Sequence, residues 1–130
     1  MNEPHWITSD LARAIHERQL AEHGGQAGIR DPHLLESALA RPKQLYCCGD
    51  PAPDLCALAA EYAYGISKNH PFLDGNKRAA FVAYRVFLKW NGLDLNASRD
   101  DRYLKMLALA AGELSKEDFA RWLREVTEAA

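Results

Sequence analysis

The sequence predicts an all-α fold, a compact bundle of six helices, and three observations support that prediction. Apolar residues recur at intervals of three and four along most of the chain, which is the spacing of one face of a helix. Capping residues and helix-stopping residues separate these stretches. Strand-like alternation is absent from the sequence, outside one proline-rich segment at 42–53.

The first two helices follow from their caps and stops. The first is expected to start near residues 8–9 and to run to about residue 23, because Gly24-Gly25 stops it. The second is expected over 32–41, with Asp31 as its cap and a proline in its first position. It should end before Pro42, because the residue that precedes a proline disfavours the α conformation.

A flap and four further helices complete the predicted bundle. Residues 42–53 contain three prolines and one glycine, so we expect an irregular flap or a short hairpin there. The apolar spacing predicts a third helix over about 54–68 and a fourth over about 76–90. Two more helices fit 99–111 and 115–128.

Length and composition bound the class of protein. A chain of 130 residues fits a single domain, covering 1–130. Charged residues interrupt every apolar stretch before the roughly 20 residues of a membrane span, and the opening residues lack the pattern of an export signal. The three cysteines, Cys47, Cys48 and Cys56, match neither a disulfide framework nor a zinc site, so free thiols in a reducing cytoplasm are expected.

Positive charge is concentrated in one segment of an otherwise acidic chain. The whole chain carries a net charge of −2, but residues 68–89 hold five basic residues against one acid, a net charge of +4. The acidic balance of the remainder argues against a nucleic-acid track, which needs a wider basic surface. A basic segment of this size favours a small anionic ligand or a phosphate.

The motif HPFLDGNKR, residues 70–78, lies in this segment and reads as a loop that leads into the start of a helix. A helix start offers unpaired N–H groups and a positive dipole end, which together bind phosphate. Gly75 lets the backbone approach a ligand closely. Lys77 and Arg78 oppose the helix dipole in the first turn, and a bound anion would remove that penalty.

Two side chains of the motif carry chemistry. Asp74 is its one carboxylate and a candidate ligand for Mg²⁺, which prefers one or two carboxylates together with substrate phosphates. His70 is its one group that titrates near neutral pH, and so a candidate general base for a hydroxyl nucleophile. Phe72 is expected to point inward. A purely structural reading stays open, in which Asp74-Gly75 is an ordinary turn and Asn76 a helix cap.

The motif resembles the signature of the Fic/Doc family, H-x-F-x-D/E-G/A-N-x-R. Three further stretches, IHERQLAEHGG at 15–25, GIRDPHLLESALARP at 28–42 and EYAYGISKNHPF at 61–72, resemble the Doc (death-on-curing) branch. The resemblance covers essentially the whole chain and implies a six-helix Fic/Doc-type fold.

The family transfers part of a nucleotide to a protein hydroxyl, and the resemblance implies roles for the matching residues. His70 resembles the base that deprotonates the hydroxyl, and Asp74 resembles the Mg²⁺ ligand. Phe72 matches the structural anchor of the motif. The residues that correspond to the anion hole for the nucleotide phosphates are Gly75, Asn76, Lys77 and Arg78.

Lys77 bears on which group is transferred. Family members that transfer AMP commonly have glycine there and a second arginine at the position of Phe81. Doc toxins share the lysine and resemble kinases that phosphorylate a Ser or Thr of elongation factor Tu from Mg-ATP, which arrests translation. The resemblance therefore implies a kinase toxin. AMP-type transfer remains an alternative, because Pro71 and Gly75 are closer to the AMP-transferring pattern.

The resemblance also implies partners. Many Fic proteins carry an inhibitory helix, S/T-x-x-x-E-G/N, but no glutamate in this chain is followed by glycine or asparagine. We therefore expect restraint by a Phd-like antitoxin whose helix covers the site, and the flap at 42–53 to position the target by β-augmentation. An alternative of another class is a catalytically silent module that binds a nucleotide or an antitoxin. Direct binding of nucleic acid or membrane is not expected.

Overall fold

The computed structural model describes residues 3–130 and contains six helices and one small two-stranded sheet within that range. Along the chain the elements are α1 (Ser9–His23), α2 (Pro32–Cys48), α3 (Leu55–Asn69), α4 (Asn76–Trp90), β1 (Leu93–Leu95), α5 (Arg99–Ala111), α6 (Lys116–Val126) and β2 (Thr127–Ala129). The prediction of an all-α fold with six helices is confirmed.

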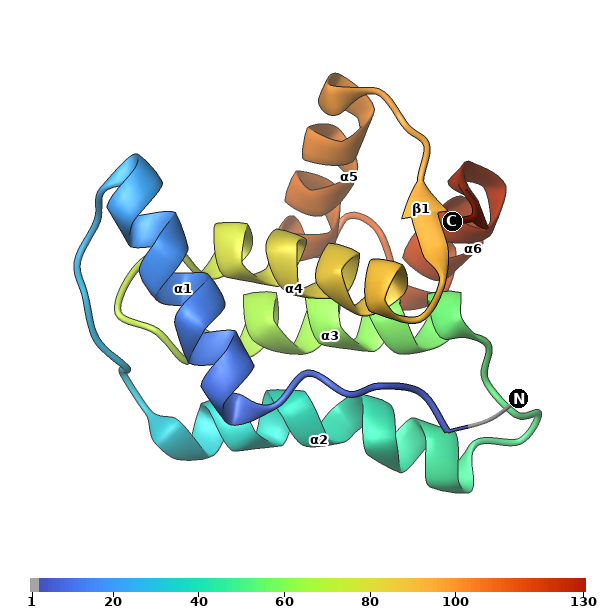
Figure 1. The fold of residues 1–130 in the computed structure, drawn as a ribbon, viewed down its shortest axis with the longest axis horizontal. Helices are drawn as coiled ribbons and strands as arrows, with labels where there is room; N and C mark the ends of the chain where they lie inside the picture. Colours follow the sequence, from blue (N-terminus) through green and yellow to red (C-terminus); the bar gives the residue numbers. More distant parts are fainter. Residues whose placement is uncertain (1–2) are drawn as a thin grey trace.

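The α3 helix is the centre of the bundle. It packs most extensively against α4 and α2, and it also contacts α6 and α5 (Figure 1). The α1 helix packs against α4, while α5 contacts both α3 and α4. This arrangement places the short connection between α3 and α4, which carries the 70–78 motif, against the segment that joins α1 to α2.

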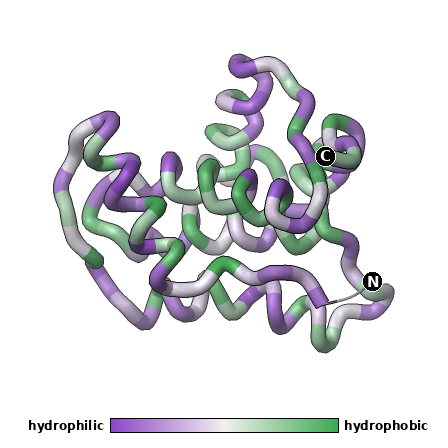
Figure 2. Tube along the Cα trace, viewed as in Figure 1, coloured by the Kyte–Doolittle hydropathy of each residue, from purple (hydrophilic) through white to green (hydrophobic). Residues whose placement is uncertain are grey.

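The buried side chains form one cluster that runs through all six helices. Its centre is α3, in which ten of fifteen residues are buried, so this helix is covered on several faces. Figure 2 shows hydrophilic residues at the outer ends of α1 and α5, where these helices leave the cluster. Burial of apolar surface is the main source of free energy that holds such a bundle together.

Side-chain caps explain where five of the helices begin. In each case a hydroxyl or carboxylate oxygen accepts a hydrogen bond from a backbone N–H in the first turn, which pairs a group that the helix itself leaves free. These capping residues are Thr8, Asp31, Asp54, Ser98 and Ser115. The exception is α4, which starts after Gly75 without a side-chain cap.

The predicted end of the second helix at Arg41 is wrong, because α2 continues through Pro42 to Cys48. Pro42 is buried, and Leu45 and Tyr46 beyond it pack against the core. A proline inside a helix costs about 3 kcal/mol, and burial of these side chains offsets that cost. The predicted flap at 42–53 is therefore reduced to the loop between α2 and α3, and it contains no hairpin.

The small sheet was not predicted. Strand β1 pairs with β2 in antiparallel register, with Leu93 opposite Ala129 and Leu95 opposite Thr127. Each strand has three residues, too few to produce a recognisable alternation in the sequence. The same pairing ends α6 at Val126, slightly before the expected residue 128.

Two compositional predictions can also be compared with the fold. Cys47, Cys48 and Cys56 are all free, as predicted; Cys56 is buried and the other two are exposed. Within residues 3–130, no helix is both long enough and apolar enough to span a bilayer.

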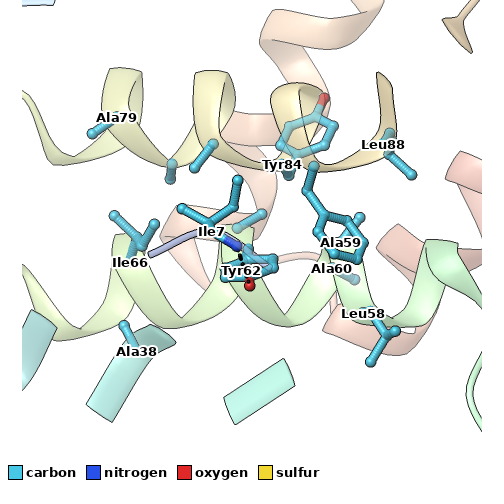
Figure 3. Close-up of a cluster of buried hydrophobic side chains, with 14 of the residues drawn as sticks. Ile7, Ala38, Leu58, Ala59, Ala60, Tyr62, Ile66, Ala79, Tyr84 and Leu88 are labelled. Carbon is cyan, nitrogen blue, oxygen red and sulfur yellow. Dashed lines mark hydrogen bonds between the residues drawn. The ribbon is translucent and has the colours of Figure 1, made fainter. Parts of the chain in front are cut away.

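One buried hydrogen bond fixes the N-terminal segment to the core. The Ile7 N–H donates to the Tyr62 hydroxyl of α3 at 2.9 Å, and both residues lie inside the cluster (Figure 3). Burial raises the pKa of Tyr62 to about 12, so the hydroxyl remains protonated under ordinary conditions. The bond closes a sequence separation of 55 residues.

We expect Tyr62→Phe to lower the free energy of unfolding by about 1–3 kcal/mol, because the buried Ile7 N–H loses its acceptor. Urea unfolding of both proteins measures this difference. Tyr103→Phe is the matched control, since Tyr103 is 63% exposed and loss of its hydroxyl group should have no measurable effect on unfolding. Equal stability of Tyr62→Phe and the wild type would contradict the assignment.

Candidate active site

The motif loop reverses the chain between α3 and α4 by means of two residues in the left-handed region. His70 ends α3 with φ 49° and ψ 56°, and its N–H still donates to the carbonyl oxygen of Ile66 at 3.3 Å. Gly75 precedes α4 with φ 76°. A left-handed histidine is uncommon and is retained only where the surroundings impose it. The conformation brings the His70 residue and the start of α4 to the same end of the bundle.

The Asn76 side chain closes this loop. Its Oδ1 accepts from the Phe72 N–H at 3.0 Å, and its Nδ2 donates to the Phe72 carbonyl oxygen at 3.0 Å. Phe72 and Asn76 are both buried, so the pair of bonds satisfies groups that water does not reach. Asn76 is therefore not the helix cap that its residue type suggested. Its amide is directed back at the loop, and α4 starts without a side-chain acceptor for its first N–H groups.

Asp74 is held by two backbone N–H groups. Gln26 donates to Oδ2 at 3.2 Å and Gly75 donates to Oδ1 at 2.8 Å. These two hydrogen bonds lower the pKa of the Asp74 carboxyl, and the positive charge of Arg78 adds to that effect. The carboxylate is therefore ionised at neutral pH. Asp74 is exposed to solvent, as a ligand for a divalent cation must be.

A pocket of about 410 Å³ brings the polar residues of the motif together. Four of them, His70, Asp74, Lys77 and Arg78, are exposed. Phe72 lies behind the pocket in the core. The lining residues are His70, Leu73, Asp74, Gly75, Asn76, Lys77, Arg78, Tyr103 and Leu107. Tyr103 and Leu107 come from α5, and no pattern in the sequence indicates that this helix reaches the motif.

Comparison of the sequence with known proteins shows which family the chain belongs to. A family model described as the Fic/DOC family matches residues 6–88. The chain is 31% identical to the protein named Protein kinase doc of Escherichia phage P1, over 92% of this chain and 94% of that one. The chain belongs to the Fic/Doc family. It is also 40% identical to Toxin Doc of Mycolicibacterium smegmatis, in an alignment that spans 59% of each chain, and both relatives place it in the Doc branch.

His16 of α1 supports the motif loop. The sequence alone did not indicate this role. Its ring stacks on Phe72 with centroids 3.9 Å apart, and its Nε2 donates to the Asp74 carbonyl oxygen at 2.7 Å. His16 is buried. The position of His16 in the sequence could have predicted its burial. His16 lies one turn after Ala12 and next to Ile15, on the buried face of α1.

The segment between α1 and α2 supports the same loop from another side. Arg30 donates from its guanidinium to the carbonyl oxygens of His70 at 2.7 Å and Asn69 at 2.8 Å, and its backbone N–H donates to the Pro71 carbonyl at 2.7 Å. The Leu73 N–H donates to the Gly28 carbonyl oxygen at 3.1 Å. These contacts hold the backbone of the motif loop in place. No local pattern in the sequence predicts these contacts.

A divalent cation bound at this site would have one carboxylate ligand from the protein, that of Asp74. Within the described residues, no group of three or more His, Cys, Asp or Glu side chains is arranged to hold a metal ion. The ionised, exposed Asp74 carboxylate fits a cation whose other ligands are phosphate oxygens and water, which is the ordinary arrangement for Mg²⁺ with a nucleotide.

We expect the Asp74 carboxyl to titrate below the ordinary aspartate pKa of about 3.9. Because its pKa is lowered in the folded chain, its ionisation favours folding above about pH 4, and this contribution is lost as the pH falls through the lower, folded value. NMR titration of the side-chain carboxyl measures this, with Asp74→Asn to identify the signal. A midpoint at or above the ordinary value would contradict the two backbone hydrogen bonds.

Proposed function

We propose that this Fic/Doc chain is a toxin that transfers the terminal phosphate of Mg-ATP to a Ser or Thr hydroxyl of a protein. The observation that carries the proposal is the convergence of His70, Asp74 and the uncapped start of α4 on one pocket. The two relatives, one named as a protein kinase and the other as a toxin, support the same reading.

His70 acts as the general base in this proposal. A ring nitrogen takes the proton of the substrate hydroxyl while the hydroxyl oxygen bonds to the terminal phosphorus, and the bond from that phosphorus to the bridging oxygen of ADP breaks. The backbone of His70 is fixed by Arg30, so its exposed side chain starts from a defined position. A silent binding module has no use for a base at this place.

The other residues of the motif bind and orient the phosphates. Asp74 would hold Mg²⁺, which when bound neutralises charge on the phosphate oxygens. The free N–H groups at the start of α4 face the same oxygens. Arg78 donates to them in a bidentate manner, and Lys77 adds a point charge where AMP-transferring relatives commonly have glycine. Lys77 is therefore our reason to favour transfer of the terminal phosphate over transfer of AMP.

The proposed protein substrate is elongation factor Tu, and its modification would arrest protein synthesis in the cytoplasm. A toxin of this kind requires a neutralising partner, and we infer a Phd-like antitoxin whose helix covers the pocket. Growth arrest on expression of this chain alone, relieved by a co-encoded partner, is the expected result. Harmless expression, with no binding of a co-encoded peptide, would reject this part of the proposal.

The transfer reaction itself is tested with purified chain, Mg²⁺, elongation factor Tu, and ATP labelled at either the α or the γ phosphate. We expect label only from the γ position, and we expect His70→Ala to reduce transfer at least a hundredfold. His33→Ala is the matched control, since the His33 side chain is 91% exposed and remote from the motif in sequence.

Each other outcome of this assay has a definite meaning. Label that arrives from the α position would establish nucleotidyl transfer and contradict the weight placed on Lys77. Transfer that survives His70→Ala unchanged would remove His70 as the base. Absence of any transfer to any protein in a cell extract would leave the silent binding module as the better account.

A further inference from the structure

Three helices each place a cationic side chain around the ring of Tyr64, on a face of the bundle that the proposed mechanism does not use. The guanidinium carbon of Arg41 in α2 lies 5.4 Å from the ring centroid. The ammonium groups of Lys116 in α6 and Lys68 in α3 lie 5.5 Å and 5.9 Å from it. Tyr64 is half-buried. These four residues, the Tyr64 cluster, bring three positive charges together on one surface.

The carboxylate that pairs with the Tyr64 cluster is buried. It belongs to Glu61 of α3, which pairs with Lys116 at 2.7 Å and with Arg41 at a much longer 4.0 Å. Lys68 forms no ion pair with any residue from 3 to 130, and its ammonium donates to the Ala110 carbonyl oxygen at 3.2 Å. The outer surface of the cluster is therefore positive, because its counter-charge lies in the interior and is used mainly by Lys116.

Surface ion pairs elsewhere in the chain differ from this arrangement. Arg18, for example, pairs with Glu22 at 3.0 Å, and both residues are exposed. An exposed pair of this kind leaves little net charge for a partner to recognise. Arg41 and Lys68 have no exposed acidic partner among residues 3–130, so their charge remains available to a second molecule.

A hollow of about 470 Å³ lies at the same place, lined by residues of α2, α3 and α6. The α2 and α6 helices each pack on α3, and the hollow lies where the side chains of all three meet. The hollow gives side chains of a partner access to the Arg41 guanidinium. Its lining residues are Ser37, Arg41, Gln44, Leu45, Cys48, Gly49, Glu61 and Lys116.

The Tyr64 cluster adjoins the pocket that contains His70. Lys68 precedes His70 by only two residues, at the end of α3. Its hydrogen-bond partner Ala110 lies about one turn beyond Leu107 on α5, and Leu107 lines the motif pocket. A protein that presents a hydroxyl to His70 therefore passes close to Lys68.

We propose that the Tyr64 cluster docks an acidic segment of the protein substrate, whose carboxylates bind Arg41 and Lys68 while the substrate hydroxyl lies at His70. This inference rests on the proposed function, because it takes a protein as the acceptor of the phosphate. Arginine and tyrosine are enriched where binding energy concentrates in protein interfaces. Complementary charge speeds encounter and discriminates against wrong partners. The cluster therefore selects the substrate by charge, at a place separate from the transfer step.

Direct binding tests the docking surface, with elongation factor Tu as the probe and without ATP, so that no transfer occurs. We expect Arg41→Glu and Lys68→Glu each to weaken binding about tenfold at low salt. The difference should shrink as salt is added, because ions screen exposed charges. Lys43→Glu is the matched control: Lys43 is exposed on α2 two residues after Arg41 and does not line the hollow, so its reversal should change binding less than about twofold.

The transfer assay separates docking from catalysis. In both glutamate variants we expect the KM for the protein substrate to rise about tenfold, while kcat and the KM for Mg-ATP stay within about twofold of the wild type. A merely structural role would lower kcat as well. Thermal unfolding checks the fold of every variant, and Arg41→Gln and Lys68→Gln, which remove charge without adding repulsion, decide the matter where a glutamate variant unfolds early.

Failure of the docking surface and failure of the kinase give different results. Binding of elongation factor Tu that depends on Arg41 and Lys68, without any transfer of label, would keep the docking surface and reject the kinase. Transfer of γ label with an unchanged KM for the protein substrate in folded variants would keep the kinase and reject the docking surface.

Three other outcomes would also overturn the docking surface. The first is a native chain that does not bind elongation factor Tu, and the second is a loss of binding that Lys43→Glu reproduces. The third is loss of antitoxin binding in the Arg41 and Lys68 variants with substrate binding intact, which would make the antitoxin the occupant of the Tyr64 cluster.

Discussion

The geometry of the site depends on one interaction, the two hydrogen bonds between the Asn76 amide and the backbone of Phe72. They close the loop at its buried side, where an unpaired amide group would cost about 1–3 kcal/mol. The Phe72 ring lies in the core and His16 stacks on it, so the loop is held at this buried point. The positions of the candidate base and of the candidate metal ligand follow from that closure.

The α4 helix begins differently from the other helices of the described chain. Each of the others begins with a side-chain cap, but the capping position of α4 is Gly75, which has no side chain to accept from the first N–H groups. The first N–H groups are therefore left for a ligand, and Lys77 and Arg78 sit at the end of the helix where cations are least favourable. Three further arginines, Arg85, Arg99 and Arg102, line a recess next to the motif pocket. The unpaired N–H groups and the cations lower the stability of this end of the bundle, as is common at functional sites.

Much of this could be predicted from the sequence, because the signals are local. Caps, glycine stops and apolar spacing located the six helices, and the motif located the residues that line the pocket. The misses have tertiary causes. Burial of Pro42 carried α2 past a proline, and strands of three residues have no pattern to detect. His16, Arg30 and Tyr103 reach the motif from other elements, and contacts of that kind are not encoded by spacing within the motif itself.

The most direct test of the account is amide hydrogen exchange at Phe72 in the chain without nucleotide. If the Asn76 side chain holds the loop before any ligand arrives, the Phe72 N–H should exchange as slowly as the buried amides of α3, although it lies outside any helix. Asn76→Ala should then release it to the rate of the exposed loop residues. Rapid exchange of Phe72 in the unmodified chain would contradict a preformed site and make the loop geometry a product of ligand binding.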